Sequence, residues 1–172
     1  RYGTHLFNAM TPLTQRQPGL PAAMLTASEV VTGLIADGFH VHPALNKIIV
    51  SLQGCQGLNL VSDAIAAVGM PPGHYMLNEF AVSVNDGQCR LADGTIAGSV
   101  LSLDAALRNL LRFTGCTLPE ALATVTSTPA RLLGIAHERG QIAAGHIADL
   151  LLLTSDLEVQ TAISAGQIVH QS

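Results

Sequence analysis

Three apolar segments of strand length lie near the start of the chain, and each of them ends in polar residues. They cover residues 4–8, 30–36 and 58–61. Their apolar positions are nearly continuous rather than alternating, which is typical of strands buried on both faces of a parallel sheet. Between the second and third segments, residues 43–53 carry apolar side chains at a helical spacing. The order strand, helix, strand predicts a βαβ unit and an α/β fold.

The pattern changes after residue 75. Residues 75–90 alternate between apolar and polar positions and carry the turn sequence Asn85-Asp86-Gly87, which favours a β-hairpin or an excursion from the main fold. A glycine-rich stretch follows. The remaining expected elements are helices at 103–114, 118–127 and 130–133, then short strands at 140–142, 149–153 and 159–169, the last with a turn at Ala165-Gly166.

Composition indicates that part of the surface is covered. Hydrophobic residues make up 48% of the 172 positions, which is ample for a core, whereas only 12% of the residues are charged. That is about half of the usual charged share in a globular domain. We therefore expect further chain or a partner to cover much of the surface. The net charge of −4 does not provide the basic surface that a nucleic-acid-binding protein requires.

Neither a membrane span nor an export signal is evident. No apolar run reaches the ~18 residues of a membrane helix, and the N-terminus lacks the layout of a signal peptide. Cys55, Cys89 and Cys116 are odd in number and widely spaced, so they fit neither a disulfide framework nor a zinc knuckle. We expect a cytoplasmic protein. Because the chain begins at Arg1 rather than at a methionine, we also expect a trimmed or excised piece of a longer protein.

Five polar residues follow the three apolar segments: His5, Asn8, His40, His42 and Asp63. Sites in parallel α/β proteins are built at the carboxyl ends of strands. A neutral imidazole can bind a divalent metal, and a carboxylate can take a proton from metal-bound water. Taken singly, each residue is better explained by a core or capping role. Their occurrence together at three strand ends favours a site.

Arg16 lies in the loop 11–19 that follows the first segment. A lone arginine in a loop is usually solvated. Beside His40 and His42 at one edge of a sheet, it would be able to hold a phosphate through paired hydrogen bonds.

Several blocks of the sequence resemble one family. Thr4-His5-Leu6-Phe7-Asn8-Ala9-Met10 with the following Arg16-Gln17-Pro18-Gly19, the stretch 35–43 (IADGFHVHP) and the stretch 60–64 (LVSDA) are similar to blocks of N-acetylglucosamine-6-phosphate deacetylases. Ser62 stands where that family usually has threonine. Later blocks at 93–99, 108–109, 129–131, 140–145 and 148–150 are similar too, the last two being common to many amidohydrolases. The chain therefore resembles the C-terminal portion of this family over nearly its whole length.

The resemblance implies a role for each matching residue. His5 would bind a divalent metal, zinc or iron, at the end of barrel strand six. Asp63, after strand eight, would act as general base and then as general acid. His40 would contact the sugar and help to polarise the carbonyl group. The other implied substrate contacts are Asn8, Ala9 and Arg16 around the sugar phosphate, and Ala97, Gly98 and Ser99 in a lining loop.

The same resemblance implies a reaction and a fold. The reaction is metal-dependent hydrolysis of the N-acetyl group of N-acetylglucosamine 6-phosphate, which gives glucosamine 6-phosphate and acetate. The fold is an α/β, (β/α)8 TIM-like amidohydrolase barrel with a small β-sandwich domain, and the intact enzyme would be a homodimer. Residues 1–135 would supply barrel strands six to eight with the following helices, and residues 136–172 the C-terminal strands of the small domain.

The chain departs from the family at its start. Members carry five further barrel strands before this segment, together with a His-x-His region, a metal-binding glutamate and a second metal-binding histidine. None of these preceding elements is matched in the 172 residues, whose own His40-Val41-His42 belongs to the later block 35–43. A (β/α)8 barrel takes about 250 residues, and three strands cannot close one. We therefore expect this chain alone to be incomplete as an enzyme.

Three alternatives stay open. One is an N-acetylgalactosamine-6-phosphate deacetylase, since nothing in these residues separates the two epimers. Another is a different amidohydrolase, such as a dihydroorotase-like enzyme, although the loop with Arg16 argues against it. The third is a truncated, non-catalytic fragment that folds only against a partner or by exchange with another copy.

Overall fold

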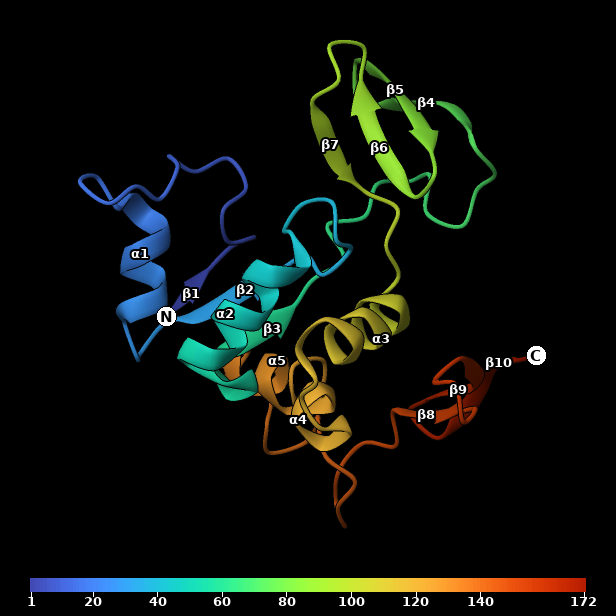
Figure 1. Ribbon diagram of the computed structural model, residues 1–172. Coiled ribbons are helices and arrows are strands. Elements are labelled where there is room, and N and C mark those ends of the chain that lie inside the picture. Colours follow the sequence, from blue (N-terminus) through green and yellow to red (C-terminus); the bar gives the residue numbers. More distant parts are fainter.

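The computed structural model describes residues 1–172 and contains three separate sheets (Figure 1). The first is parallel, in the order β1-β2-β3, with strands Tyr2–Gly3, Val31–Leu34 and Leu58–Leu60. The helices are α1 (Gly19–Thr26), α2 (Pro43–Gln53), α3 (Leu103–Thr114), α4 (Leu118–Ala123) and α5 (Ser127–Leu132), with a short 3-10 turn at Cys55–Gly57. The other two sheets are antiparallel and stand apart from the first in Figure 1.

The parallel sheet carries the predicted βαβ unit. Strand β2 pairs in parallel with β3, and helix α2 connects the two. Strand β1 pairs in parallel with the other side of β2. The backbone N–H of Leu60 donates to the carbonyl oxygen of Thr124 at 3.2 Å, so the outer side of β3 is partly covered by chain that follows α4.

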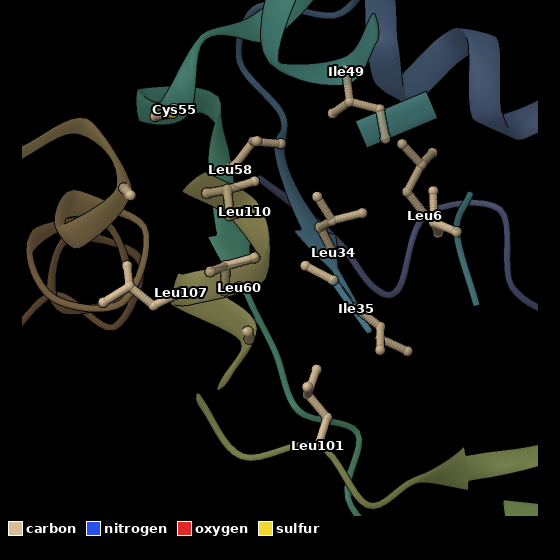
Figure 2. Close-up of a cluster of buried hydrophobic side chains, with 14 of the residues drawn as sticks. Leu6, Leu34, Ile35, Ile49, Cys55, Leu58, Leu60, Leu101, Leu107 and Leu110 are labelled. Atoms are coloured by element: carbon tan, nitrogen blue, oxygen red, sulfur yellow. The ribbon is translucent and has the colours of Figure 1, made fainter. Parts of the chain in front are cut away.

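The main core lies between this sheet and its helices. Figure 2 shows Leu34 of β2 and the following Ile35 close to Leu58 and Leu60 of β3, with Leu107 and Leu110 of α3 beside them. All six side chains are buried. Apolar burial of this kind contributes about 1.5–3 kcal/mol for each large side chain, so the sheet and helices are stabilised as one unit.

The ends of α2 and α3 follow from local chemistry. Pro43 is the first residue of α2, where its missing N–H costs no hydrogen bond, and His42 caps that end by accepting a hydrogen bond on Nδ1 from the N–H of Ala44 at 3.2 Å. Gly115 ends α3 in a left-handed conformation, with φ of 73°. Both helices have the bounds that their apolar spacing predicts.

The second sheet contains the predicted hairpin, formed by its two central strands, and one further antiparallel strand on each side of it. Its strands are β4 (Gly73–Leu77), β5 (Phe80–Asn85), β6 (Gln88–Leu91) and β7 (Ile96–Ser99). Asp86 and Gly87 form the turn between β5 and β6 with φ of 48° and 75°, as a tight hairpin of this twist requires. A small core of its own includes the buried residues Val82, Val84 and Cys89.

The third sheet is formed by the end of the chain. Strands β8 (Leu150–Leu153), β9 (Val159–Ser164) and β10 (Gln167–Gln171) run antiparallel in the order β10-β9-β8, and β9 and β10 form the predicted hairpin. The Arg108 guanidinium on α3 donates to the carbonyl oxygen of Leu157 at 2.8 Å. None of the helices is both long and apolar enough for a membrane crossing.

Four sequence-based expectations were wrong in detail. Residues 4–8 form turns rather than a strand, because the backbone enters the left-handed region there. Residues 140–142 form bends and loop rather than a strand. The expected helix at 118–127 ends at Ala123, and Ser127 begins a separate helix that replaces the one expected at 130–133. Helix α1 was not expected, since its sequence has no polar face that would reveal a helical period.

Candidate functional site

The three strand ends lie at one edge of the parallel sheet. After β1, the N–H of Leu6 donates to the carbonyl oxygen of Gly33 at 2.9 Å, and after β3, the N–H of Val61 donates to the carbonyl oxygen of Leu34 at 3.0 Å. The chain therefore continues beside β2 on both sides beyond the assigned strands. This brings His5 and Asp63 to the carboxyl edge of the sheet, which is where parallel α/β proteins build their sites.

His5 sits in a strained turn with an unpartnered ring nitrogen. Three non-glycine residues in this turn have positive φ: His5 (31°), Phe7 (73°) and Ala9 (53°). Such conformations are uncommon outside glycine and persist only where the surroundings impose them. Nδ1 of His5 is buried without a hydrogen-bond partner. A buried polar atom is nearly always satisfied, so this nitrogen fits a ligand that the chain itself does not supply.

The amide of Asn8 holds this turn closed. Its Nδ2 donates to the carbonyl oxygens of His5 at 3.3 Å and of Leu6 at 3.1 Å. Ala9 is exposed next to it. Arg16 is also exposed, in the loop before α1, and makes no hydrogen bond or ion pair in the structure. No hydrogen bond joins Arg16 to His40 or to His42, and the Nδ1 of His42 is already used in capping α2.

His40 is paired with Asp37 at the end of β2. Its Nδ1 lies 2.6 Å from Oδ2 of Asp37, and both side chains are only 6% exposed. The other oxygen of Asp37, Oδ1, accepts hydrogen bonds of 2.8 Å from the N–H groups of Phe39 and His40. Burial raises the pKa of Asp37, but these hydrogen bonds outweigh it and hold the pKa of the carboxyl below its usual value.

Asp63 lies beside the glycine-containing strand β7. The N–H of Ser99 donates to the carbonyl oxygen of Asp63 at 2.8 Å, and Ile65 donates to the carbonyl oxygen of Ser99 at 2.9 Å. The hydroxyl of Ser99 also donates to the carbonyl oxygen of Ser62. The carboxylate-bearing Asp63 is exposed with φ of 49°, and no helix begins there, so an N-cap role does not explain it.

The approach of β7 depends on glycine at position 98. Gly98 has φ of 70°, and a Cβ there would lie 2.7 Å from Cγ2 of Ile65 and 3.2 Å from the carbonyl oxygen of Asp63. A side chain would therefore push the two segments apart. The structure thus brings Ala97, Gly98 and Ser99 next to Asp63, although 34 to 36 positions separate them from it in sequence.

The described residues do not form a complete metal site. No group of three or more histidine, cysteine, aspartate or glutamate side chains is placed to hold one ion. Catalytic zinc sites in proteins typically use three such ligands. The unpartnered Nδ1 side of the His5 ring fits a single ligand position.

Asp37 is the site residue to which the sequence pattern assigned no role. It lies three positions after the last residue of β2 and three positions before His40. That spacing in a turn was the available signal, since an aspartate readily accepts hydrogen bonds from the N–H groups two and three residues later.

Comparison with protein families and curated proteins gives a consistent result. A model described as the amidohydrolase family matches residues 1–169. The chain is 36% identical over 169 residues to an N-acetylglucosamine-6-phosphate deacetylase of Bacillus subtilis (strain 168), which covers 98% of the chain and 43% of that relative. It is 41% identical over 167 residues to a putative N-acetylgalactosamine-6-phosphate deacetylase of Escherichia coli (strain K12), which covers 95% of the chain and 98% of that relative.

Solved structures agree with these sequence matches. The structure of N-acetylglucosamine-6-phosphate deacetylase from Thermotoga maritima matches with a TM-score of 0.95 at 37% identity, over 99% of this chain and 47% of that one. A mutant of the Mycobacterium smegmatis enzyme in complex with N-acetyl-D-glucosamine-6-phosphate matches with a TM-score of 0.92 at 38% identity, over 98% of this chain and 45% of that one. The chain thus spans less than half of the length of these two proteins and of the Bacillus relative.

Proposed function

Because the chain belongs to the amidohydrolase family, whose members are generally metal-dependent, we propose that it forms part of an N-acetylglucosamine-6-phosphate deacetylase. The reaction is hydrolysis of the acetamido group of N-acetylglucosamine 6-phosphate to glucosamine 6-phosphate and acetate. The names of the Bacillus and Thermotoga relatives support this substrate. The observation that carries the proposal is the match over nearly the whole chain, with Asp63 and Ser99 side by side at the carboxyl edge of the sheet.

In the proposed enzyme, residues 1–135 belong to a (β/α)8 barrel. Strands β1, β2 and β3 would be its strands six, seven and eight, which is consistent with their parallel order and the helix between β2 and β3. Residues 136–172 would contribute the C-terminal strands of a small β-domain, consistent with the antiparallel sheet β8 to β10. A homodimer is the proposed assembly of the intact enzyme.

Asp63 would carry the proton in this reaction. Its carboxylate would take a proton from the attacking water and then return it to the leaving amine nitrogen, so that one group serves as base and acid in turn. An exposed carboxylate at the edge of the sheet is accessible to a substrate. The neighbouring strand β7 would limit where the substrate can lie, because its backbone is fixed to that of Asp63.

His5 would bind the metal, for which zinc or iron is the proposed identity. When bound, such an ion would polarise the acetyl carbonyl and lower the pKa of a bound water. The remaining ligands would come from residues outside this chain. The protein's own contribution here is the strained turn that holds the His5 ring in place.

The substrate would be held by three groups of residues. His40 would contact the sugar through the ring nitrogen that Asp37 leaves free. The cation of Arg16 would pair with the phosphate, next to the segment with Asn8 and Ala9. The remaining contacts would come from the lining strand, with Ala97, Gly98 and Ser99.

Hydrolysis of the galactosamine epimer is the second candidate. The Escherichia coli relative at 41% identity is named as a putative N-acetylgalactosamine-6-phosphate deacetylase. The two sugars differ in the orientation of one hydroxyl. A direct comparison of acetate release from the two phosphorylated sugars decides between them.

The proposed function is tested by acetate release with zinc or iron added. The chain is assayed alone and after mixing with the part of the Bacillus relative that it does not match. We expect activity only in the mixture, because the chain lacks a complete metal site. A folded mixture that binds metal but releases no acetate from either sugar phosphate would contradict a deacetylase, and activity of the chain alone would contradict the proposed source of the ligands.

A further inference from the structure

The pair of Asp37 and His40 is almost completely enclosed. Nδ1 of His40 lies 2.6 Å from Oδ2 of Asp37, and each side chain is 6% exposed. The pair occupies the turn that leaves β2, at the same edge of the sheet as His5 and Asp63. No other histidine of the chain lies within salt-bridge distance of a carboxylate.

The two carboxylate oxygens of Asp37 have different hydrogen-bond partners. Oδ1 accepts the N–H groups of Phe39 and His40, and Oδ2 faces the imidazole. An ionised carboxylate can only accept hydrogen bonds, and hydrogen bonding holds the pKa of Asp37 below its usual value. Nδ1 of His40 must therefore carry a hydrogen. The other ring nitrogen, Nε2, makes no hydrogen bond within the chain and is left for an external partner.

Helix α3 also holds the turn that contains Asp37 and His40. The amide Nδ2 of Asn109 donates to the carbonyl oxygen of Ala36, directly before Asp37, at 2.9 Å. Gly38 has φ of 85°, and a Cβ there would lie 3.2 Å from the ring of Phe113. The turn is thus held by its own aspartate on one side and by α3 on the other, so the imidazole has little freedom to rotate.

We propose that Asp37 is a positioning residue that fixes His40 in the form protonated at Nδ1 and thereby presents Nε2 to the substrate. While the ring is neutral, Nε2 accepts a hydrogen bond from a donor such as a sugar hydroxyl. Once the ring is protonated, Nε2 donates to an oxygen of the substrate, and Nδ1 keeps its hydrogen in both forms. The identity of the substrate rests on the proposed function. The tautomer of His40 rests only on its contact with Asp37.

Asp37→Asn tests the proposal because it reverses the hydrogen-bonding character of one atom only. The side-chain oxygen of the asparagine is still required by the N–H groups of Phe39 and His40, so its NH₂ group faces the imidazole. That group donates, and Nδ1 would have to give up its hydrogen to accept. The substitution should therefore move the hydrogen of neutral His40 from Nδ1 to Nε2 while keeping the turn.

The measurement is the ¹⁵N NMR spectrum of the imidazole nitrogens of the 172-residue chain at alkaline pH, where the neutral ring is observed. His40 is assigned by its loss in His40→Gln. His42 is an internal control with the opposite tautomer, because its Nδ1 accepts a hydrogen bond from Ala44. We expect Nδ1 of His40 to show the ¹⁵N chemical shift of a protonated nitrogen in the wild type, and Nε2 to show it in Asp37→Asn. The chemical shifts of His42 should be the same in both.

The proposal would be overturned if neutral His40 of the wild type were protonated at Nε2, or if Asp37→Asn left its tautomer unchanged. Either result would count regardless of the catalytic activity of the assembled enzyme. A second readout uses the assembled enzyme. Asp37→Asn should lower kcat/KM by roughly 100-fold or more, and it should have little further effect in a His40→Ala background. Equal losses in both backgrounds would show that Asp37 acts only on the fold.

Discussion

The backbone N–H of Ser99 donates a hydrogen bond of 2.8 Å to the carbonyl oxygen of Asp63. This contact joins the end of the antiparallel strand β7 to the segment that follows the parallel strand β3, so the proposed proton carrier lies where the two parts of the chain are connected. Because the bond is between backbone atoms, it fixes the position of Asp63 and leaves its carboxylate free. The proposed chemistry and the junction between the two sheets therefore depend on the same few residues.

The junction predicts that Gly98→Ala is destabilising. Its left-handed φ of 70° and the approach of Ile65 and Asp63 both oppose a Cβ. We expect a loss of about 2–4 kcal/mol in the free energy of unfolding, measured in urea. Gly94→Ala is the matched control, because Gly94 has φ of 86° but nothing within 4 Å of its Cβ position. It should cost only about 1 kcal/mol; equal costs at both positions would mean that the close approach is unimportant.

The depressed pKa of Asp37 predicts an acid-dependent contribution to stability. A group whose pKa is lower in the folded state stabilises the fold above its unfolded pKa, which is about 3.9 for aspartate. That contribution is lost as pH falls from about 4 through the lower folded value. The difference in unfolding free energy between the wild type and Asp37→Asn should therefore shrink on acidification. A difference that stays constant from neutral pH to the acid transition would contradict this.

The cysteines should differ in reactivity. Burial, together with the neighbouring Cys116 thiol, raises the pKa of Cys55 to about 12, and burial raises the pKa of Cys89. The thiolate is the reactive form, and only Cys116 is partly exposed. We expect alkylation of the folded chain at Cys116 alone, read by mass spectrometry, and alkylation of all three cysteines in urea. Early modification of Cys55 in the folded chain would show that it is not enclosed.

The parts of the fold that could be predicted are those with a local cause. Helices α2 and α3 combine a clear apolar spacing with a proline or glycine at an end, and both were predicted with their bounds. The hairpin between β5 and β6 could be predicted because Asp86 and Gly87 suit a tight turn, and the pairing of the two strands confirms it. Residues 4–8 were wrongly expected as a strand, since an apolar pattern does not show that the backbone of His5 and Phe7 enters the left-handed region.

The candidate site could be predicted only as a set of strand-end residues. The sequence pointed to His5, His40 and Asp63, and the structure places all three at the carboxyl edge of one parallel sheet. The pairing of His40 with Asp37 depends on the geometry of a turn, which no spacing of apolar residues encodes. The roles of Arg16 and of the other substrate contacts stay predictions, because they depend on a ligand rather than on contacts within the chain.

The most direct test of the central claim is acetate release from N-acetylglucosamine 6-phosphate by the assembled, metal-loaded enzyme with Asp63 or with Asp63→Asn. The carboxylate is exposed, so the substitution should leave the fold and its urea transition unchanged. Removal of the general base and acid should lower kcat by roughly 100- to 10,000-fold. A folded Asp63→Asn enzyme that turns over as fast as the wild type would contradict the account.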